Sequence, residues 1–240
     1  MRVLIGSDLH ANLEAIRALP SDCDRLWVLG DLMNYGPNPA EVVDFVRENA
    51  AVVVRGNHDH SLGFDEDPRC SARFRAMAEE MRRYTQRVLS HEQRDYLRHL
   101  PLRATAIVDG VRFLMCHAAP PDPLFEYRGE ESPLWLADEV ASDIEIELVG
   151  HTHIPFRRFL GTRWVVNPGS VGQPKHGRAE ACYAIWQDGE LSLGSAAYDV
   201  EQTVEKLRRL WLSAAVFEDL AFVLRNGTAP TAPADSPTGA

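Results

Sequence analysis

The sequence predicts an α/β fold with a parallel sheet, a second group of strands and a helical insertion between them. Two observations lead to this prediction. Over the first 60 residues, short apolar runs alternate with helical spacing, as in parallel strands joined by helices. Between residues 66 and 100 that alternation stops and a helical pattern fills the stretch. We expect one domain over 1–225, since a chain of 240 residues suits a single large domain, with 66–100 as its insertion or cap.

The first half contains three predicted strands and two predicted helices. The strand runs are short, apolar and followed by a glycine or a polar residue, and they lie at 3–5, 26–29 and 51–54. Helical spacing covers residues 12–19 and stops at Pro20. A second helix is expected over 38–49, because Asn38 can cap it and Pro39 suits its first turn.

Helices in the insertion and strands beyond it complete the prediction. A capping-box pattern at 90–93 marks the start of the second helix in the insertion. The later strand patterns lie close together and are expected to form an antiparallel second sheet; the patterns after the insertion lie at 111–116, 146–149, 163–166, 182–187 and 190–197. One helix fits 200–224, with Trp211 near its buried face. The tail at 226–240 is rich in Thr, Ala, Pro and Gly and is expected to be disordered.

Composition and charge narrow the function classes. The net charge is −10 and no basic face is evident, which argues against nucleic-acid binding. The four cysteines are scattered without a Cys-x-x-Cys pair, so neither a zinc ribbon nor a disulfide framework is indicated. The apolar runs are too short to span a bilayer, and Asp8 comes too early for a signal peptide. We expect a cytoplasmic protein without a membrane partner, and the oligomeric state stays open.

Five segments each place metal-competent side chains just after an apolar strand run. They are Asp8-Leu9-His10, Gly30-Asp31, Gly56-Asn57-His58-Asp59, His117 and Gly150-His151-Thr152-His153. Each segment alone is typical of a turn, a helix cap or a hydrogen-bonded core histidine. In an open α/β sheet, however, ligands bind at the carboxyl ends of the strands. Five such ends together predict one shared metal site.

The order of these segments resembles that of the calcineurin-like metallophosphoesterases, and in particular the YfcE-like branch of small phosphodiesterases. Supporting stretches are Ser7–Asn12, Gly150–Pro155 and Asn167–Pro174. The resemblance spans residues 1–63 and about 105–199, and it does not clearly cover the insertion. It implies a four-layer α/β/β/α sandwich of two mixed sheets, the metallo-dependent phosphatase fold.

The resemblance also implies two divalent metal ions held by seven residues. Asp8, His10, Asp31 and His153 would hold the first ion, and Asp31, Asn57, His117 and His151 the second. Carboxylate and imidazole ligands without a thiolate suit Mn, Fe, Zn, Co or Ni and do not choose among them. A hydroxide between the two ions would attack the phosphorus.

Two further residues receive catalytic roles from the same resemblance. His58 would be the general acid that protonates the leaving oxygen. Asp59 would orient the His58 ring or, alternatively, would only cap the loop.

Substrate contacts are expected from Asn12, which can orient the first loop, and from the basic cluster of Lys175, His176 and Arg178. For His176 a plain surface loop is the alternative. The predicted enzyme is a metal-dependent phosphoric ester hydrolase (EC 3.1), most simply a phosphodiesterase acting on a small phosphoester. The alternatives are a phosphomonoesterase or protein phosphatase, a dinucleoside polyphosphate hydrolase if the insertion forms a base-binding cleft, and a non-catalytic scaffold of the same fold. A scaffold has no need of a general acid, so the presence of His58 argues against it.

Overall fold

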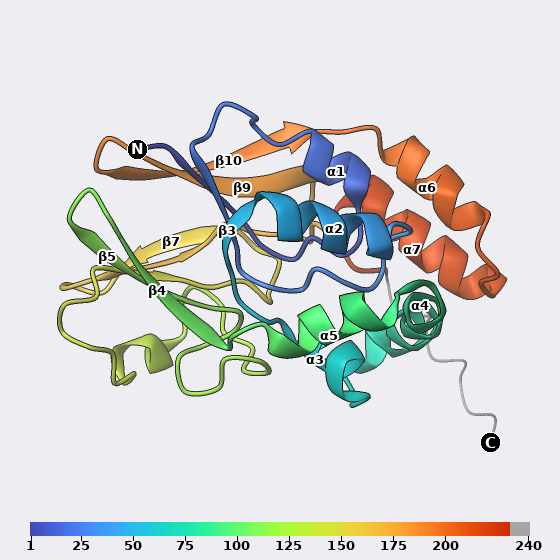
Figure 1. Cartoon of the computed structure of the whole chain (residues 1–240), viewed down its shortest axis with the longest axis horizontal. Helices are drawn as coiled ribbons and strands as arrows, with labels where there is room; N and C mark the ends of the chain where they lie inside the picture. The colour runs from blue at the N-terminus through green and yellow to red at the C-terminus, as the bar shows by residue number, and fades with distance from the viewer. Residues whose placement is uncertain (231–240) are drawn as a thin grey trace, which may run out of the picture.

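Two mixed sheets packed face to face form the centre of the computed structural model, which describes residues 1–230 (Figure 1). The first sheet has the order β10-β9-β1-β2-β3, and the second has the order β4-β5-β6-β8-β7. The strands of the first sheet are β1 (Val3–Gly6), β2 (Arg25–Val28), β3 (Ala50–Val53), β9 (Glu180–Gln187) and β10 (Glu190–Ala197). Those of the second are β4 (Arg103–Val108), β5 (Val111–Cys116), β6 (Ile146–Leu148), β7 (Phe156–Phe159) and β8 (Trp164–Asn167). The expected two mixed sheets with helices are confirmed.

Each sheet has a parallel centre. In the first sheet β1, β2 and β3 run parallel, while β9 pairs antiparallel with β1 and β10 with β9. In the second sheet β5, β6 and β8 run parallel, and β4 and β7 pair antiparallel at the two edges. The parallel centres matter for function because their carboxyl ends are where ligands bind in such sheets.

Large side chains from both sheets fill the layer between them. Trp27 of β2 meets Phe113 of β5 edge to face, with ring centroids 5.2 Å apart. Phe113 also meets Trp186 of β9 at 5.2 Å, and all three rings are buried. Edge-to-face contacts of this kind add to the free energy that burial of the rings supplies. These buried contacts therefore fix the position of one sheet relative to the other.

Helices cover the outer face of the first sheet and continue beyond its end (Figure 1). They are α1 (Leu13–Arg17), α2 (Pro39–Asn49), α3 (Asn57–Phe64), α4 (Arg75–Val88), α5 (His91–His99), α6 (Val200–Arg208) and α7 (Ala214–Asn226). Residues of α1, α2, α3 and α5 share one buried cluster with that face. The outer face of the second sheet is covered by the segment 117–145, which contains the short 3-10 helix η2 (Pro133–Leu136) and the buried Trp135.

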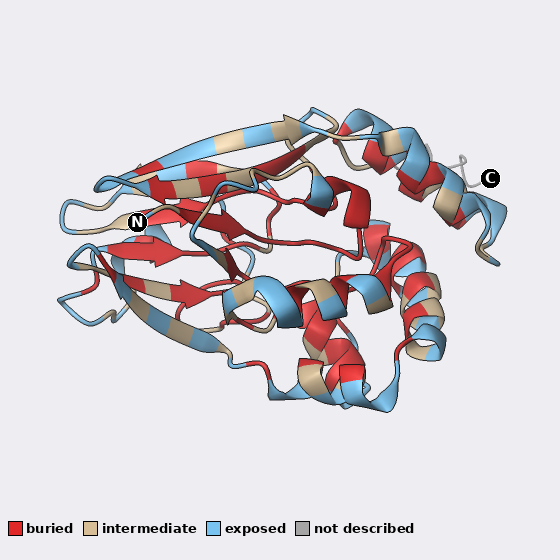
Figure 2. Cartoon of the chain, turned by 45° about the horizontal axis from the view of Figure 1, so that its top comes forward, coloured by how far each residue is buried: buried red, intermediate tan, exposed pale blue. Residues whose placement is uncertain are grey.

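The insertion is built into the body of the molecule by two separate contacts. Met77 and Met81 of α4 are fully buried in a cluster with α6, α7 and the 3-10 helix η1 (Ala72–Phe74). Leu97 of α5 is buried in the cluster beneath the first sheet. Ser90 starts α5 with the predicted capping box, because it accepts a hydrogen bond from the Gln93 N–H while the Gln93 side chain accepts one from the Ser90 N–H. Figure 2 shows the buried residues gathered in the strands and on the inward faces of these helices.

The strand prediction was wrong in two respects. β9 and β10 belong to the first sheet and not to an antiparallel second sheet, because β9 pairs with β1 along Val3–Ile5. Alternating burial predicts that a segment is a strand, but it does not choose the strand's neighbour. The edge strands β4 and β7 were missed, because β7 is short with two arginines at its centre, and β4 begins with alternating Arg, Ala and Thr before its two large apolar residues.

The helix expected over 200–224 is divided into α6 and α7. Ser213 caps α7 through a hydrogen bond from the Val216 N–H, so the segment 209–213 connects two helices. Trp211 lies in this connection with 98% of its surface exposed, opposite to its expected buried position. Asn226, where the expected disordered tail starts, is the last residue of α7, and the part of that tail at 231–240 lies outside the described residues.

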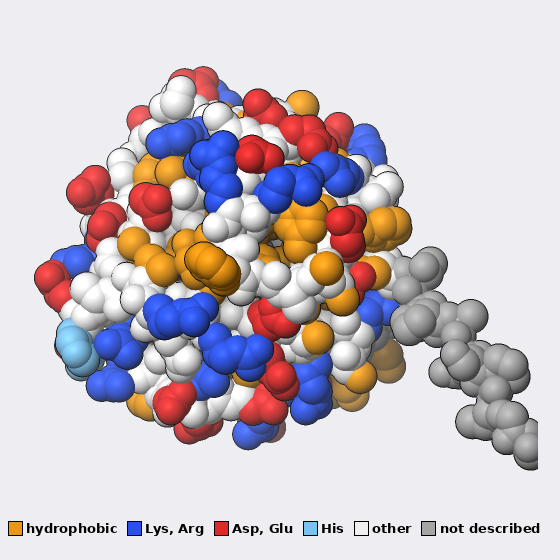
Figure 3. Space-filling view, turned by 90° about the vertical axis from the view of Figure 1, so that its right-hand side faces the viewer, with side chains coloured by type: hydrophobic (Ala, Val, Ile, Leu, Met, Phe, Trp, Pro, Cys, Tyr) orange, Lys and Arg blue, Asp and Glu red, His pale blue; other side chains and the backbone are white. Residues whose placement is uncertain are grey.

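The helical end of the molecule presents a mixed surface (Figure 3). Hydrophobic side chains gather near its middle, and Lys, Arg, Asp and Glu side chains surround them. Within residues 1–230, none of the helices has the length and apolar character needed to cross a membrane.

Candidate metal centre and its cavity

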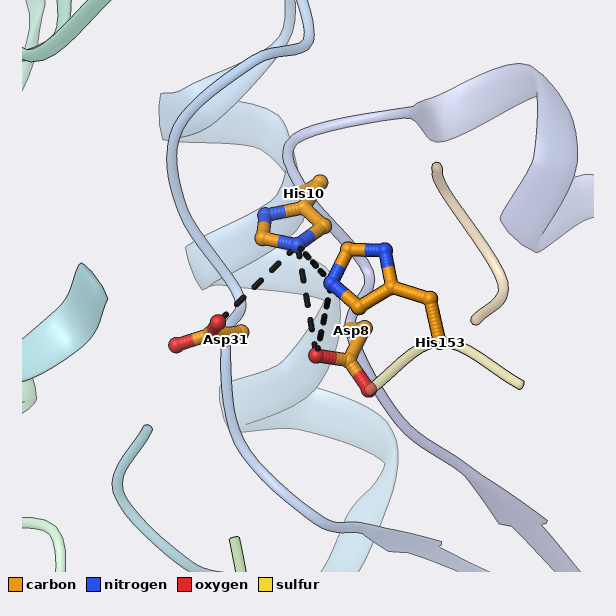
Figure 4. A group of neighbouring side chains, drawn as sticks. All are labelled: Asp8, His10, Asp31 and His153. Carbon is orange, nitrogen blue, oxygen red and sulfur yellow. Dashed lines mark hydrogen bonds and ion pairs between the residues drawn. The ribbon is translucent and has the colours of Figure 1, made fainter. Parts of the chain in front are cut away.

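Four side chains from both sheets meet at the carboxyl ends of their strands (Figure 4). Asp8 follows β1, His10 lies in the same loop, and Asp31 follows β2. His153 follows β6 of the second sheet. Each residue offers one ligand atom, and these atoms all lie within 4.8 Å of one another. The four are buried, so they form one polar cluster inside the protein.

A second group forms beside the first and shares Asp31 with it. Its other members are His117, directly after β5, and His151, both within the same 4.8 Å limit. The Asn57 Oδ1 atom lies 3.1 Å from the His117 Nε2 atom, so Asn57 also faces this group. The structure therefore brings together all seven side chains that the sequence predicted as metal ligands.

Both carboxylates use one oxygen for a backbone contact and leave the other facing the cluster. The Asp31 Oδ1 atom accepts the His58 N–H at 2.9 Å, and Asp31 Oδ2 lies 3.3 Å from His117 Nε2. Asp8 Oδ2 accepts the His151 N–H at 3.1 Å. Asp8 Oδ1 has no hydrogen-bond partner among the described residues, although it is buried. A buried carboxylate oxygen without a donor is costly unless a cation lies beside it.

Backbone hydrogen bonds orient three of the histidines so that their Nε2 atoms point into the polar cluster. Three Nδ1 atoms lie against backbone carbonyls, which only accept, so each Nδ1 carries a proton, and in the neutral ring each Nε2 carries the lone pair. The carbonyls belong to Met33 for His10 at 2.9 Å, Leu29 for His117 at 2.8 Å and Gln173 for His153 at 2.6 Å. His10 Nε2 and His153 Nε2 then face each other at 3.1 Å. Two lone pairs at that distance repel unless a cation or a proton lies between them, so this donor set fits a divalent metal.

Charge in the cluster shifts the pKa values of its members. Burial opposes the ionisation of Asp31, but the neighbouring His117 and His58 outweigh it and hold the pKa of this carboxyl well below its usual range. Burial alone would lower the pKa of His117, but the Asp31 carboxylate raises it to about 9. In the metal-free protein the His117 proton therefore supplies positive charge that a metal would otherwise supply.

The loops that carry the ligands have an unusual backbone. Five of the seven predicted ligand residues have a positive φ: Asp8 (54°), His10 (43°), Asp31 (51°), His151 (67°) and His153 (62°). This left-handed conformation costs on the order of 1 kcal/mol for a residue with a side chain. The neighbouring packing must supply that free energy to keep the side chains convergent.

Gly56 shows how closely the loops approach. A Cβ atom on this residue would lie 2.1 Å from Asp31 Oδ1 and 2.3 Å from the Asp31 backbone nitrogen. Only glycine permits that approach, which also places the start of α3 against the Asp31 carboxylate.

His58 lies beside the two groups and is held by a residue that the sequence analysis missed. Asn34 Nδ2 donates to His58 Nδ1 at 2.9 Å and to the Ala78 carbonyl of α4 at 3.2 Å. Asn34 Oδ1 accepts the Tyr35 N–H, so all these contacts agree on the orientation of the amide. His58 Nδ1 is therefore an acceptor, and the proton of the neutral ring lies on Nε2. No motif surrounds Asn34; its left-handed φ of 75° is visible only in the structure.

The role expected for Asp59 is corrected. Its oxygens accept the Met33 N–H at 3.2 Å and the Gly56 N–H at 3.0 Å, so Asp59 caps the loop and does not touch the His58 ring. Its two oxygens join the loops after β2 and β3, and the described residues show no hydrogen bond between Asp59 and the His58 ring. The capping alternative thus describes its contacts.

A cavity of about 560 Å³ opens over the two groups. Its polar floor includes Asp31, Asn57, His58, His151 and His153. Its walls are mainly aromatic and basic, and they include Tyr35, Arg69, Phe74, Phe125, Tyr127 and Lys175. The lining comes from both sheets, from the segment 69–74 that enters the insertion, and from the loop after β8.

Three of the four predicted substrate contacts lie outside this lining. Asn12 is buried and donates to the Gly172 carbonyl at 3.0 Å, so it joins the first loop to the loop after β8. The His176 ring lies 3.6 Å from the Cys182 sulfur, and Arg178 is exposed. Of the predicted basic cluster, Lys175 lines the cavity.

Comparisons with known proteins agree with this geometry. Residues 1–188 match the calcineurin-like phosphoesterase superfamily domain. The chain is 30% identical to an uncharacterized protein of Methanocaldococcus jannaschii, over 90% of this chain and 97% of that protein. The crystal structure of a metallophosphoesterase from Sphaerobacter thermophilus is 31% identical, with a TM-score of 0.77 over 93% of this chain and 99% of that one.

Two relatives carry names of activities. Phosphodiesterase YfcE of Escherichia coli is 26% identical over 80% of this chain and 91% of its own length. A symmetrical bis(5′-nucleosyl)-tetraphosphatase of Thioalkalivibrio sulfidiphilus is 32% identical over 59% of this chain, and the match spans 48% of that enzyme.

Gly56→Ala is expected to destabilise the protein by about 2–3 kcal/mol and to reduce its metal content, because the new Cβ would displace the Asp31 carboxylate. Urea unfolding and elemental analysis measure the two effects. Gly129→Ala is the matched control, since a Cβ there meets no atom within 4 Å. Equal stability and metal content in the two variants would contradict this account of Gly56.

The stability of the chelator-treated protein is expected to depend on pH through His117. The pKa of His117 is raised above its usual 6.5, so its ion pair with Asp31 stabilises fully below pH 6.5, and this stabilisation is lost as the pH rises towards 9. The free energy of unfolding should fall over that interval, by at most about 3 kcal/mol. His117→Gln should abolish the fall; an unchanged slope in that variant would show that another group titrates.

Proposed function

This chain belongs to the calcineurin-like phosphoesterase superfamily, and from that membership we propose that it hydrolyses a phosphodiester at a centre of two divalent metal ions. The observation that carries the proposal is the pair of ligand groups sharing Asp31 on the floor of one cavity. Metal sites a few ångströms apart are typical of phosphoester hydrolysis. Similarity to a phosphodiesterase that covers 91% of that relative favours a diester substrate.

The ligand set fits more than one metal. Divalent ions held there would supply Lewis-acid polarisation of the phosphoryl oxygens and an ionised water near neutral pH. Mn, Fe, Zn, Co and Ni all accept carboxylate and imidazole ligands, so manganese and zinc are two candidates for loading experiments.

His58 lies in the lining of the cavity, where it can donate its Nε2–H to a substrate oxygen. Burial lowers the pKa of His58 to about 4, against the opposing effect of Asp31, so the ring is neutral at pH 7. A neutral imidazole is a poor source of a whole proton but a good hydrogen-bond donor to developing negative charge. We therefore assign to His58 a hydrogen bond to a phosphoryl or leaving oxygen, in place of proton transfer from an imidazolium.

A phosphomonoesterase remains the nearest alternative, because the same side chains would serve both reactions. The ratio of hydrolysis of bis(p-nitrophenyl) phosphate to that of p-nitrophenyl phosphate decides between them. We expect this ratio to exceed one in metal-loaded protein. A ratio well below one would assign the chain to monoesters.

Asp31→Asn is expected to lose both bound metal and activity, since Asp31 belongs to both ligand groups. His58→Ala should keep its metal and lose about 100-fold in kcat, because it removes only a donor to the substrate. Elemental analysis and rates on bis(p-nitrophenyl) phosphate measure both. His99→Ala, at an exposed histidine of α5, is the control. Wild-type turnover by both variants would sink the mechanism.

Asn34→Ala is expected to lower kcat by about 10- to 100-fold without changing metal content, because it frees the His58 ring to rotate. The carboxylate of Asn34→Asp would accept a hydrogen bond from a protonated His58 Nδ1 and so stabilise the imidazolium. In a profile of kcat against pH, the fall in activity on the acidic side should then occur at higher pH in this variant than in the wild type. A profile that keeps its shape while only the rate falls would reduce Asn34 to a packing role.

A further inference from the structure

We propose that Lys175, together with Arg69 at the mouth, forms a second anion-binding subsite in the cavity. The preferred phosphodiester would then carry a further phosphate group in addition to the phosphoryl group that reacts. This inference rests on the proposed function, and it identifies the class of diester that the site selects.

The two cations have no counter-ions. Among residues 1–230, the side chains of Lys175 and Arg69 take part in no ion pair and no hydrogen bond. Lys206, the other lysine of the chain, pairs with the buried Glu14. Asp31 is the one acidic residue in the cavity lining, and its oxygens already face His58 N–H and the histidines. The protein as a whole is acidic, with a net charge of −10, but this part of the cavity holds two cations without neighbouring anions.

Aromatic rings hold both cations without using their N–H donors. The Lys175 Nζ atom lies 4.3 Å from the centroid of the Phe74 ring, and the Arg69 guanidinium lies 4.3 Å from that of Phe125. A ring face attracts a cation through its quadrupole and leaves the hydrogens free for a ligand. The donors of both residues therefore remain available to phosphate oxygens.

A chain of ring contacts ties Lys175 to the candidate metal centre. Tyr35 lies with its ring centroid 4.9 Å from those of His10 and His58, and 6.2 Å from that of Phe74. Lys175 is half-buried above Phe74. Burial lowers the pKa of Lys175 to about 8, as expected for an ammonium group removed from water without a counter-ion. A bound phosphate would supply that counter-ion.

The cavity is larger than the reacting group requires. Its volume of about 560 Å³ lies in the range of sites that enclose a whole small molecule. The phosphoryl group would occupy the floor over the ligand groups. The remaining lining, with Phe74, Phe125 and Tyr127, offers planar faces to the body of the substrate. A nucleotide-like diester with a second phosphate fits both the charges and the rings.

The test compares substrates that share one scissile bond. These are the p-nitrophenyl ester of thymidine 5′-phosphate, the same ester with a 3′-phosphate, and the p-nitrophenyl ester of thymidine 5′-diphosphate. We expect at least one bisphosphorylated ester to have a kcat/KM about tenfold above that of the simple ester. Lys175→Gln and Arg69→Gln should each remove most of this advantage through KM, and so lower kcat/KM several-fold more on the preferred bisphosphorylated ester than on the simple ester. Arg73→Gln, an exposed charge in η1 outside the lining, is the control.

Two outcomes overturn the subsite: no preference for either bisphosphorylated ester, or equal losses on all substrates in the two variants. Failure to hydrolyse any ester with metal bound would instead refute the proposed function. In that case the subsite can still be tested by measuring ligand binding, which needs no hydrolysis. By calorimetry, metal-loaded wild type should bind thymidine 3′,5′-bisphosphate about tenfold more tightly than Lys175→Gln or Arg69→Gln does. Equal affinities would refute it, and thermal unfolding verifies that each variant is folded.

Discussion

One oxygen of the Asp31 carboxylate accepts the His58 N–H at the start of α3, and the other faces His117, which follows a strand of the second sheet. Asp31 therefore connects the loop after β2 to the start of α3 and also belongs to both candidate ligand groups. Asp8 repeats the arrangement through the His151 N–H, which crosses between the sheets. The packing of the two sheets through Trp27 and Phe113 therefore sets the ligand geometry from a distance.

Two unfavourable contributions to the free energy oppose this arrangement of the candidate metal centre. Left-handed backbone at the ligand residues stores strain, and buried like-charged or lone-pair atoms face one another. The compensation comes from backbone partners: carbonyls fix the Nδ1 atoms of three histidines, and N–H groups fix both carboxylates. Main-chain partners are rigid, so the donors stay convergent whether a proton or a metal supplies the positive charge.

Sequence reasoning predicted what depends on local pattern and missed what depends on pairing. The meeting of the five segments could be predicted, because each follows an apolar strand run and parallel strands end together, whereas the choice of seven candidate ligands came from the family resemblance. The place of β9 beside β1 could not, since alternation does not name a partner. The buried position expected for Trp211 failed because Ser213 starts a new helix there. Arg69 belongs to no motif, and its proximity to Phe125 exists only in three dimensions.

The hydrogen bond from Asn34 to the Ala78 carbonyl bears on how this fold can diversify. Helix α4 belongs to the insertion, and through Asn34 it helps to orient the His58 ring in the cavity. The insertion is thus not an exchangeable module. A homologous insertion grafted in its place would bring a new specificity surface and disturb the histidine at the same time. A change in the insertion that moves the Ala78 carbonyl would therefore alter the orientation of His58 as well as the wall of the cavity.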